Sequence, residues 1–142
     1  MSPRSPMSIQ ATTLTVGSVM TPDPVTINGE EPLSAAVDMM ALHGVHHLPV
    51  VINGVVESVV SDRDLGRFLL PGHKLSQEEE PLVREVCPLR AYLADVNDPL
   101  DCIVEAMLET GVEAVPILRE GELAGIFTRH DACYTLTQYL RS

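Results

Sequence analysis

A chain of 142 residues, 45% of them hydrophobic, is long enough for one domain or two small ones and too apolar for a disordered tail. The formal net charge of −11 repels the phosphate backbone and argues against nucleic acid as a partner, but it does not exclude a small anion in a local basic pocket. No apolar run approaches the ~18 residues of a membrane-spanning helix, so we expect no membrane association.

The beginning of the chain and its cysteines indicate the compartment. Residues 1–13 lack the apolar core of a secretion signal, and we expect a flexible arm there. Cys87, Cys102 and Cys133 are odd in number and widely spaced, which argues against a disulfide framework or a zinc knuckle. We therefore predict a cytoplasmic protein with reduced thiols.

An internal repeat organises the rest of the chain. Pro49 and Pro116 lie 67 positions apart, in the apolar contexts LPVV and VPIL. Without a gap, the same shift pairs Pro32 with Pro99, Leu33 with Leu100, Val37 with Val104, Met40 with Met107, Gly44 with Gly111, Val45 with Val112, Gly54 with Gly121, Ser61 with Thr128 and Asp64 with Asp131. The repeat predicts two similar halves, residues 14–70 and 84–142, joined by a polar, acidic linker at residues 71–83.

The first half is predicted to have the order β-α-β-β-α, which makes the fold α+β. An extended segment at residues 25–27 precedes a helix that begins near Pro32 and ends at Gly44. The apolar positions of this helix recur three and four residues apart, as in an amphipathic helix, at Leu33, Ala36, Val37, Met40 and Ala41. Two strands joined by the hairpin turn Asn53-Gly54 follow, and a second helix starts after Ser61.

The second half repeats this order. An extended segment at residues 92–94 is followed by a helix between Pro99 and Gly111, by two strands joined at residues 120–121, and by a helix after Thr128, with Leu136 and Leu140 among its apolar positions. A unit of this size is marginal alone. We therefore expect the two halves to pack their sheet faces together with pseudo-twofold symmetry, which creates two equivalent clefts.

Each half ends its last strand with the pattern Ser/Thr-x-x-Asp, in VVSDRDL and IFTRHD, and two interpretations fit. In one, Ser61 and Thr128 cap the following helix, and the aspartate suits the positive end of the helix dipole. In the other, Asp64 and Asp131 accept hydrogen bonds from the vicinal hydroxyls of a ribose. The neighbouring residues serve the second interpretation, with Arg63 and Arg129 for a phosphate and Val59 and Ile126 for an adenine.

The run His43-x-x-His46-His47 allows a competing interpretation as a metal site. No second cluster of cysteine and histidine accompanies it, and a polar loop or a phosphate-facing pair also fits. Nothing in the sequence pairs a nucleophile with a positioned base, so we expect no catalysis.

The stretches GVHHLPVV and GVEAVPIL, together with VVSDRD and GIFTRHD, resemble a tandem pair of cystathionine-β-synthase (CBS) domains, a Bateman module. The resemblance implies a regulatory module that binds an adenosine-containing ligand (AMP, ADP, ATP, S-adenosylmethionine or NAD) in the clefts between the repeats. It implies a homodimer and no required cofactor, and the regulated protein would be a separate partner. A ligand-free interaction scaffold and a metal-responsive switch are the alternatives.

The resemblance also implies roles for individual residues. Asp64 and Asp131 would contact ribose hydroxyls, with Ser61 and Thr128 near ribose or phosphate, and His46 and His47 would reach phosphates. The adenine beside Thr128 is expected to contact Thr21, Val25, Val45 and Ile126, and the adenine beside Ser61 is expected to contact Val59, Pro88, Tyr92 and Val112.

The two clefts are predicted to be unequal. Glu113 and Ala114 replace the histidine pair in the second half, so the first cleft suits phosphates better. Gly125 stands where the first half has Ser58, so we expect the second cleft to be roomier.

Overall fold

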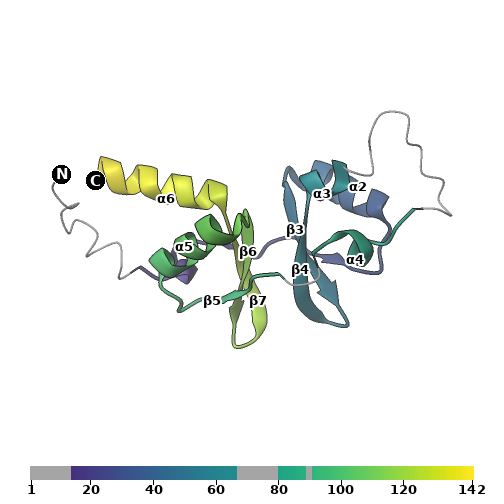
Figure 1. Ribbon diagram of the computed structural model, residues 1–142, viewed down its shortest axis with the longest axis horizontal. Coiled ribbons are helices and arrows are strands. Elements are labelled where there is room, and N and C mark those ends of the chain that lie inside the picture. Colours follow the sequence, from purple (N-terminus) through teal and green to yellow (C-terminus); the bar gives the residue numbers. More distant parts are fainter. Residues whose placement is uncertain (1–13, 67–79, 89–90) are drawn as a thin grey trace. The chain divides into compact units, whose positions relative to one another are not determined.

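The computed structural model describes residues 14–66, 80–88 and 91–142. They form two compact units, which we name after the hydroxyl residues of the repeated pattern. The Thr128 unit contains the residues up to Asp23 together with Tyr92–Ser142, and the Ser61 unit is Pro24–Ala91. Each unit has its own sheet and helices (Figure 1), which confirms the α+β class. The arm at residues 1–13 and most of the predicted linker lie outside the described residues.

The Ser61 unit has a three-stranded sheet in the order β2-β3-β4. Its elements are β2 (Ile27–Asn28), α2 (Leu33–His43), β3 (His47–Ile52), β4 (Val55–Ser61), α3 (Asp62–Gly66) and α4 (Val83–Val86). Strand β3 is parallel to β2 and antiparallel to β4. Figure 1 shows α2, α3 and α4 on the same side of this sheet.

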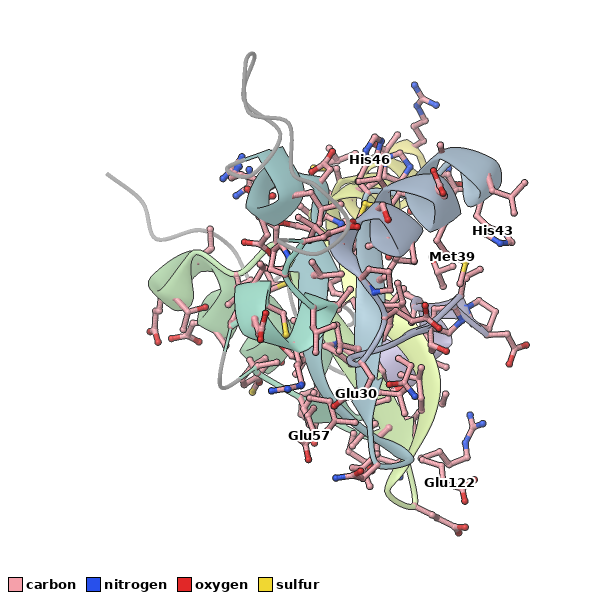
Figure 2. The ribbon with its side chains drawn as sticks, turned by 90° about the vertical axis from the view of Figure 1, so that its right-hand side faces the viewer. Glu30, Met39, His43, His46, Glu57 and Glu122 are labelled. Carbon is pink, nitrogen blue, oxygen red and sulfur yellow. The ribbon has the colours of Figure 1, made fainter. Side chains whose placement is uncertain are left out.

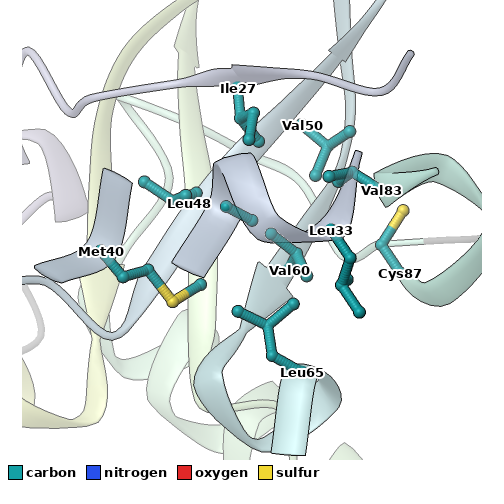
Figure 3. Close-up of a cluster of buried hydrophobic side chains, with 10 residues drawn as sticks. Ile27, Leu33, Met40, Leu48, Val50, Val60, Leu65, Val83 and Cys87 are labelled. Carbon is teal, nitrogen blue, oxygen red and sulfur yellow. The ribbon is translucent and has the colours of Figure 1, made fainter. Parts of the chain in front are cut away.

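The core of the Ser61 unit lies between these helices and the sheet (Figure 3). Its buried residues are Ile27, Leu33, Ala36, Met40, Leu48, Val50, Val60, Leu65, Val83 and Cys87. Three of the apolar positions predicted for α2 are among them, Val37 packs at the edge of the core, and Ala41 is exposed. The helix therefore buries one narrow stripe.

The Thr128 unit has a four-stranded sheet in the order β1-β7-β6-β5. Its elements are the 3-10 helix η1 (Val16–Ser18), β1 (Thr21–Pro22), β5 (Ala94–Asp95), α5 (Leu100–Thr110), β6 (Ala114–Arg119), β7 (Glu122–Thr128) and α6 (Arg129–Arg141). Strand β6 is parallel to β5 and antiparallel to β7, and β1 is antiparallel to β7.

The core of the Thr128 unit is built from α5, the sheet and η1. Its buried residues are Val16, Ala94, Val96, Leu100, Ile103, Met107, Val115, Ile117 and Phe127. Helix α6 contributes no buried residue, and its apolar side chains Tyr134, Leu136 and Leu140 are exposed. One face of this unit therefore presents apolar surface to solvent.

The turns have the conformations that their residues predict. In both hairpins the two turn residues have positive φ, 52° and 81° at Asn53-Gly54 and 52° and 83° at Glu120-Gly121. This is the twist that joins antiparallel strands closely. Helices α2 and α5 end at glycines in the left-handed conformation, Gly44 and Gly111, as predicted.

Three short elements, η1, β1 and α4, are not predicted by the β-α-β-β-α order. Helices η1 and α4 are equivalent, because Val16 and Val83 lie 67 positions apart and both are fully buried. The residues at the end of the predicted linker are also packed, since the Leu33 N–H donates to the Pro81 carbonyl at 3.0 Å. In the part of the chain that the structure describes, each helix is too short or too polar to cross a membrane.

Candidate functional site

Ser61 and Asp64 lie where β4 ends and α3 begins. The backbone N–H and the hydroxyl of Ser61 donate to Oδ2 of Asp64, at 2.9 and 3.0 Å, and the Asp64 N–H donates to the Ser61 hydroxyl at 3.1 Å. Both residues are half-buried. We call this pair, together with Ser58, Val59 and Pro88, the Ser61 site.

Thr128 and Asp131 repeat the arrangement where β7 ends and α6 begins. The N–H and the hydroxyl of Thr128 donate to Oδ2 of Asp131, at 2.9 and 3.1 Å, and the Asp131 N–H donates to the hydroxyl at 3.3 Å. The hydroxyl of Thr21 adds a bond to the other oxygen, Oδ1 of Asp131, at 2.9 Å. We call this pair, together with Thr21, Gly125 and Ile126, the Thr128 site.

The capping interpretation of both patterns is confirmed. Each hydroxyl accepts an N–H of the first helical turn, and each aspartate accepts the N–H of the residue before the helix. The helix dipole favours the negative charge at this position. Because these capping bonds use only Oδ2 of each carboxylate, capping and ligand binding are compatible.

A segment near the start of each half packs beside the capping pair of the other half. Thr21 and Pro22 pair with Ile126 and Gly125 in the sheet of the Thr128 unit. In the Ser61 unit, the hydroxyl of Ser58 donates to the carbonyl of Pro88 at 2.7 Å. Thr21 therefore lies in the same unit as Thr128, and Pro88 lies in the same unit as Ser61.

The space beside Gly125 is occupied by protein, so this glycine gives no reason to expect a roomier second cleft, and the relative size of the two clefts stays a prediction. A Cβ at this position would lie 2.7 Å from the Thr21 carbonyl oxygen and would also meet the Met20 side chain. The space is filled by the unit's own first strand. In the Ser61 unit, Ser58 is 2% exposed and its hydroxyl is bonded to protein rather than open to a ligand.

Val59 and Ile126 lie on the face of each sheet that the helices do not cover. Side chains alternate along a strand, and the neighbours Val60 and Phe127 belong to the cores beneath the helices. Val59 and Ile126 are nevertheless buried, at 9% and 6% exposure. Their predicted adenine contacts stay predictions.

Four other predicted contact residues belong to the unit opposite their predicted site. Val25 and Val45 pack against the core of the Ser61 unit, and Tyr92 and Val112 pack against the core of the Thr128 unit. Within the compact units, these side chains therefore support the cores. Their roles toward a ligand stay predictions.

The charged residues beside the two sites form equivalent pairs with opposite polarity. Nδ1 of His46 lies 3.0 Å from Oδ2 of Asp62, whereas Glu113 and Arg129, 67 positions further along, are 3.5 Å apart. The backbone bonds match as well, since the Asp62 N–H donates to the His46 carbonyl and the Arg129 N–H donates to the Glu113 carbonyl. His46 and Arg129, which are both predicted to contact a phosphate, therefore each have a carboxylate beside them.

His47 and Arg63 flank the Ser61 pair. His47 lies opposite Ser61 in the pairing of β3 with β4, where the Thr128 unit has Ala114 opposite Thr128. Arg63 is an exposed residue of α3. Two basic side chains besides His46 therefore lie near Ser61. His47 is opposite it on the neighbouring strand, and Arg63 is two residues after it in the sequence.

The geometry gives the metal interpretation no support. Among the residues that the structure describes, no three histidine, cysteine, aspartate or glutamate side chains are placed to hold a metal ion. Figure 2 shows the rings of His43 and His46 apart from each other, one at the end of α2 and the other beyond Gly44.

The cysteines are unpaired, with Cys87 buried and Cys102 and Cys133 exposed. Burial raises the pKa of the Cys87 thiol, and the charge of Asp64 adds to the rise against an opposing hydrogen bond with Ser58. Burial also raises the pKa of the Tyr92 phenol. Cys87 is therefore held as a neutral thiol and is not an activated nucleophile.

An apolar groove lies between α5 and α6. It is lined by Leu14, Leu100, Val104, Phe127, Leu136 and Tyr139, among others. None of the predicted ligand-contacting residues lines it, so the groove and the Thr128 site are different surfaces.

The sequence matches known families and proteins. The family model of the CBS domain matches residues 16–71 and residues 83–137. An uncharacterized protein of Methanocaldococcus jannaschii is 37% identical over 121 residues, which is 82% of this chain and 26% of that protein. The chain thus spans about a quarter of that relative's length.

Two solved structures are similar to this fold. The CBS domain pair of protein MJ0100, in complex with 5′-methylthioadenosine and S-adenosyl-L-methionine, has a TM-score of 0.77 at 19% identity and covers 89% of this chain and 98% of its own. The structure of CBSX2 in complex with AMP has a TM-score of 0.75 at 24% identity and covers 88% of this chain and 97% of its own.

Proposed function

We propose, from the premise that this chain belongs to the CBS domain family, that it is a regulatory module that senses an adenosine-containing nucleotide. The observation that carries the proposal is the repeated carboxylate at the start of a helix. At the Ser61 site, Oδ2 of Asp64 accepts two capping bonds, and Oδ1 has no partner among the described residues. An acceptor-only oxygen at a helix N-terminus suits the hydroxyls of a ribose.

The chemistry around Asp64 fits the rest of such a ligand. Val59 offers a buried apolar side chain two residues before Ser61. His47 and Arg63 offer positive or donor groups for a phosphate or another anionic group. The ligands of the similar structures, AMP and S-adenosyl-L-methionine with 5′-methylthioadenosine, share the adenosyl group and support this class. We include ADP, ATP and NAD among the candidates.

Sensing requires that the ligand binds two arrangements of the protein with different affinities. We propose that binding changes the packing of the repeats or of a homodimer and that a separate protein reads this change. The exposed apolar side chains Leu108, Leu136 and Leu140 of α5 and α6 support self-association. We propose no catalytic role and no required cofactor for this chain, and a cytoplasmic location stays a prediction.

The alternative is a ligand-free interaction scaffold. The complete capping bonds favour it, because they explain the repeated geometry of Ser61 with Asp64 and of Thr128 with Asp131 without any ligand. In this case the aspartates contribute only to stability, by about 1 kcal/mol each.

Isothermal titration with AMP, ADP, ATP, S-adenosylmethionine and NAD separates the two functions. Asp64→Asn keeps an oxygen for the cap and replaces the open acceptor with a donor, so we expect nucleotide binding at the Ser61 site to fall at least tenfold. Asp98→Asn is the matched control, because Oδ2 of Asp98 also accepts the N–H three residues earlier, at 2.9 Å. Absence of binding by the unmodified protein to all five ligands would leave the scaffold.

A further inference from the structure

The two equivalent aspartates accept different numbers of hydrogen bonds. From the described residues, Asp64 accepts two, both at Oδ2, whereas Asp131 accepts the same two at Oδ2 and a third at Oδ1, from the hydroxyl of Thr21. The third bond, at 2.9 Å, is as short as the shortest capping bond. The two aspartates therefore differ at Oδ1, the oxygen that takes no part in capping.

The position of Thr21 is set by the fold of its unit. Thr21 pairs with Ile126 as β1 adds to the edge of β7. The close approach of this segment depends on Gly125, because a side chain there would lie 2.7 Å from the Thr21 carbonyl oxygen. The hydroxyl is thus held beside Asp131 by backbone pairing and not by a freely moving loop.

Among the residues that the structure describes, the Ser61 site has no equivalent donor. The residue 67 positions after Thr21 is Pro88, which has neither a hydroxyl nor a backbone N–H to donate. Its carbonyl accepts the hydroxyl of Ser58, the residue that stands in place of Gly125. Oδ1 of Asp64 is therefore left without a bond from the described residues.

A carboxylate has about four acceptor positions, two on each oxygen. The two vicinal hydroxyls of a ribose need two of them, and Oδ1 of Asp64 offers both. Oδ1 of Asp131 offers one, unless the Thr21 hydroxyl turns away and gives up its bond. The third bond on Asp131 thus competes directly with a ribose.

We propose that Thr21 is a specificity-determining residue, whose hydroxyl occupies the ribose-facing oxygen of Asp131 and directs a ligand with a vicinal diol to Asp64 first. The inference rests on the proposed function and adds an order of filling to it. A single bond exchanged against water changes affinity by about three- to tenfold, so the Thr128 site is the weaker site by about this factor.

The test is AMP titration of four proteins that carry Asp64→Asn, so that the isotherm reports the Thr128 site. Thr21→Val removes the hydroxyl and keeps a β-branched side chain that suits β1. We expect it to tighten AMP binding three- to tenfold relative to Asp64→Asn alone, and we expect Thr21→Ser to restore the weaker binding. Thr137→Val removes a hydroxyl bond to the Cys133 carbonyl in the same unit and should leave binding unchanged.

The outcomes separate this inference from the proposed function. Unchanged or weaker binding by Thr21→Val, in a protein that otherwise binds AMP, overturns the role of Thr21 and leaves the sensing function intact. Binding that appears only after Thr21→Val supports the competition and removes AMP sensing at this site from the natural protein. Absence of AMP binding from the unmodified protein and from every variant overturns the inference, and absence of binding to all five ligands overturns the proposed function as well.

The diol itself is tested with 2′,3′-dideoxy-AMP. In the Asp64→Asn background, loss of the two hydroxyls should weaken binding by a larger factor in Thr21→Val than in the protein with Thr21. Equal factors in the two proteins would contradict competition between Thr21 and the ribose.

Discussion

The Ser61 unit and the Thr128 unit build the same cap from the same bonds, yet they differ in what surrounds it. His46 faces Asp62 in one unit, and Glu113 faces Arg129 in the other, so acid and base have exchanged places while the pairing persists. Equivalence of backbone therefore does not make the two sites chemically equivalent.

A second difference concerns how the segment beside each capping pair is held against the last strand of its unit. Gly125 lets the first strand approach until the Thr21 hydroxyl reaches Asp131. Ser58 holds the equivalent segment through its side chain, at the carbonyl of Pro88. The first strand of the Thr128 unit is thus held by backbone pairing, whereas the equivalent segment of the Ser61 unit is held by a side-chain hydrogen bond.

The largest expected effect is a loss of stability when a buried core residue is shortened, and it should differ between the two units. Phe127 and Val60 occupy equivalent positions, and both are fully buried. Phe127→Ala should lower the free energy of unfolding by about 3–5 kcal/mol, because it leaves a large cavity. Val60→Ala removes fewer carbons and should cost less. Urea unfolding of both variants measures the difference, and equal losses would show that the Thr128 unit relaxes around the cavity.

The next effect concerns the close approach at Gly125. Gly125→Ser places a side chain against Met20 and the Thr21 carbonyl, so we expect β1 to shift and stability to fall by about 1–3 kcal/mol. Gly66→Ser is the control, because a Cβ at Gly66 would meet no atom of the described residues within 4 Å. Thermal unfolding compares the two, and a similar small change in both would contradict tight packing of β1.

A smaller effect is expected from the corresponding bond in the Ser61 unit. Ser58→Ala removes the buried hydroxyl bond to the Pro88 carbonyl and should cost about 1 kcal/mol. Ser18→Ala removes an exposed, local bond to the Thr15 carbonyl and should cost less. Urea unfolding decides between them. A loss for Ser18→Ala that matches or exceeds that for Ser58→Ala would argue that burial adds nothing to the Ser58 bond.

The smallest effects belong to the charge pairs. His46 and Arg129 are exposed, with 77% and 68% of the side chain accessible, so alanine at either position should cost less than about 1 kcal/mol. The Arg129 pair is charged whenever Glu113 is ionised, whereas the His46 pair needs a protonated ring. Added salt should therefore reduce the effect of Arg129→Ala at neutral pH. An effect of Arg129→Ala that is independent of salt would indicate lost packing in place of lost charge.

Much of the fold follows from local signals that the repeat doubles. Gly44 and Gly111 end helices, Asn53-Gly54 forms the hairpin turn, and the spacing of apolar residues gives α2 and α5. Each of these features depends on residues within one or two turns of each other. The 67-residue shift strengthened every one of them, because each signal occurs twice.

The features that the sequence analysis missed depend on contacts between distant residues. Strand β1 exists only because Thr21 and Pro22 pair with β7, at the other end of the chain. The absence of a side chain at Gly125 indicated open space, but the residues that fill that space come from this same distant strand. The partner of Oδ1 in Asp131 could likewise not be read from the residues next to it.

The division of the chain into units has a consequence for its synthesis. The Ser61 unit is continuous in sequence, whereas the Thr128 unit joins the residues up to Asp23 with those from Tyr92 onward. The first unit is thus an insertion in the second, and it is available for folding as soon as it leaves the ribosome. Val16 must wait until Asp98 has been translated, and Thr21 and Pro22 must wait until β7 has been translated, before they find their partners. These three residues are therefore translated before the Ser61 unit but reach their native partners after it.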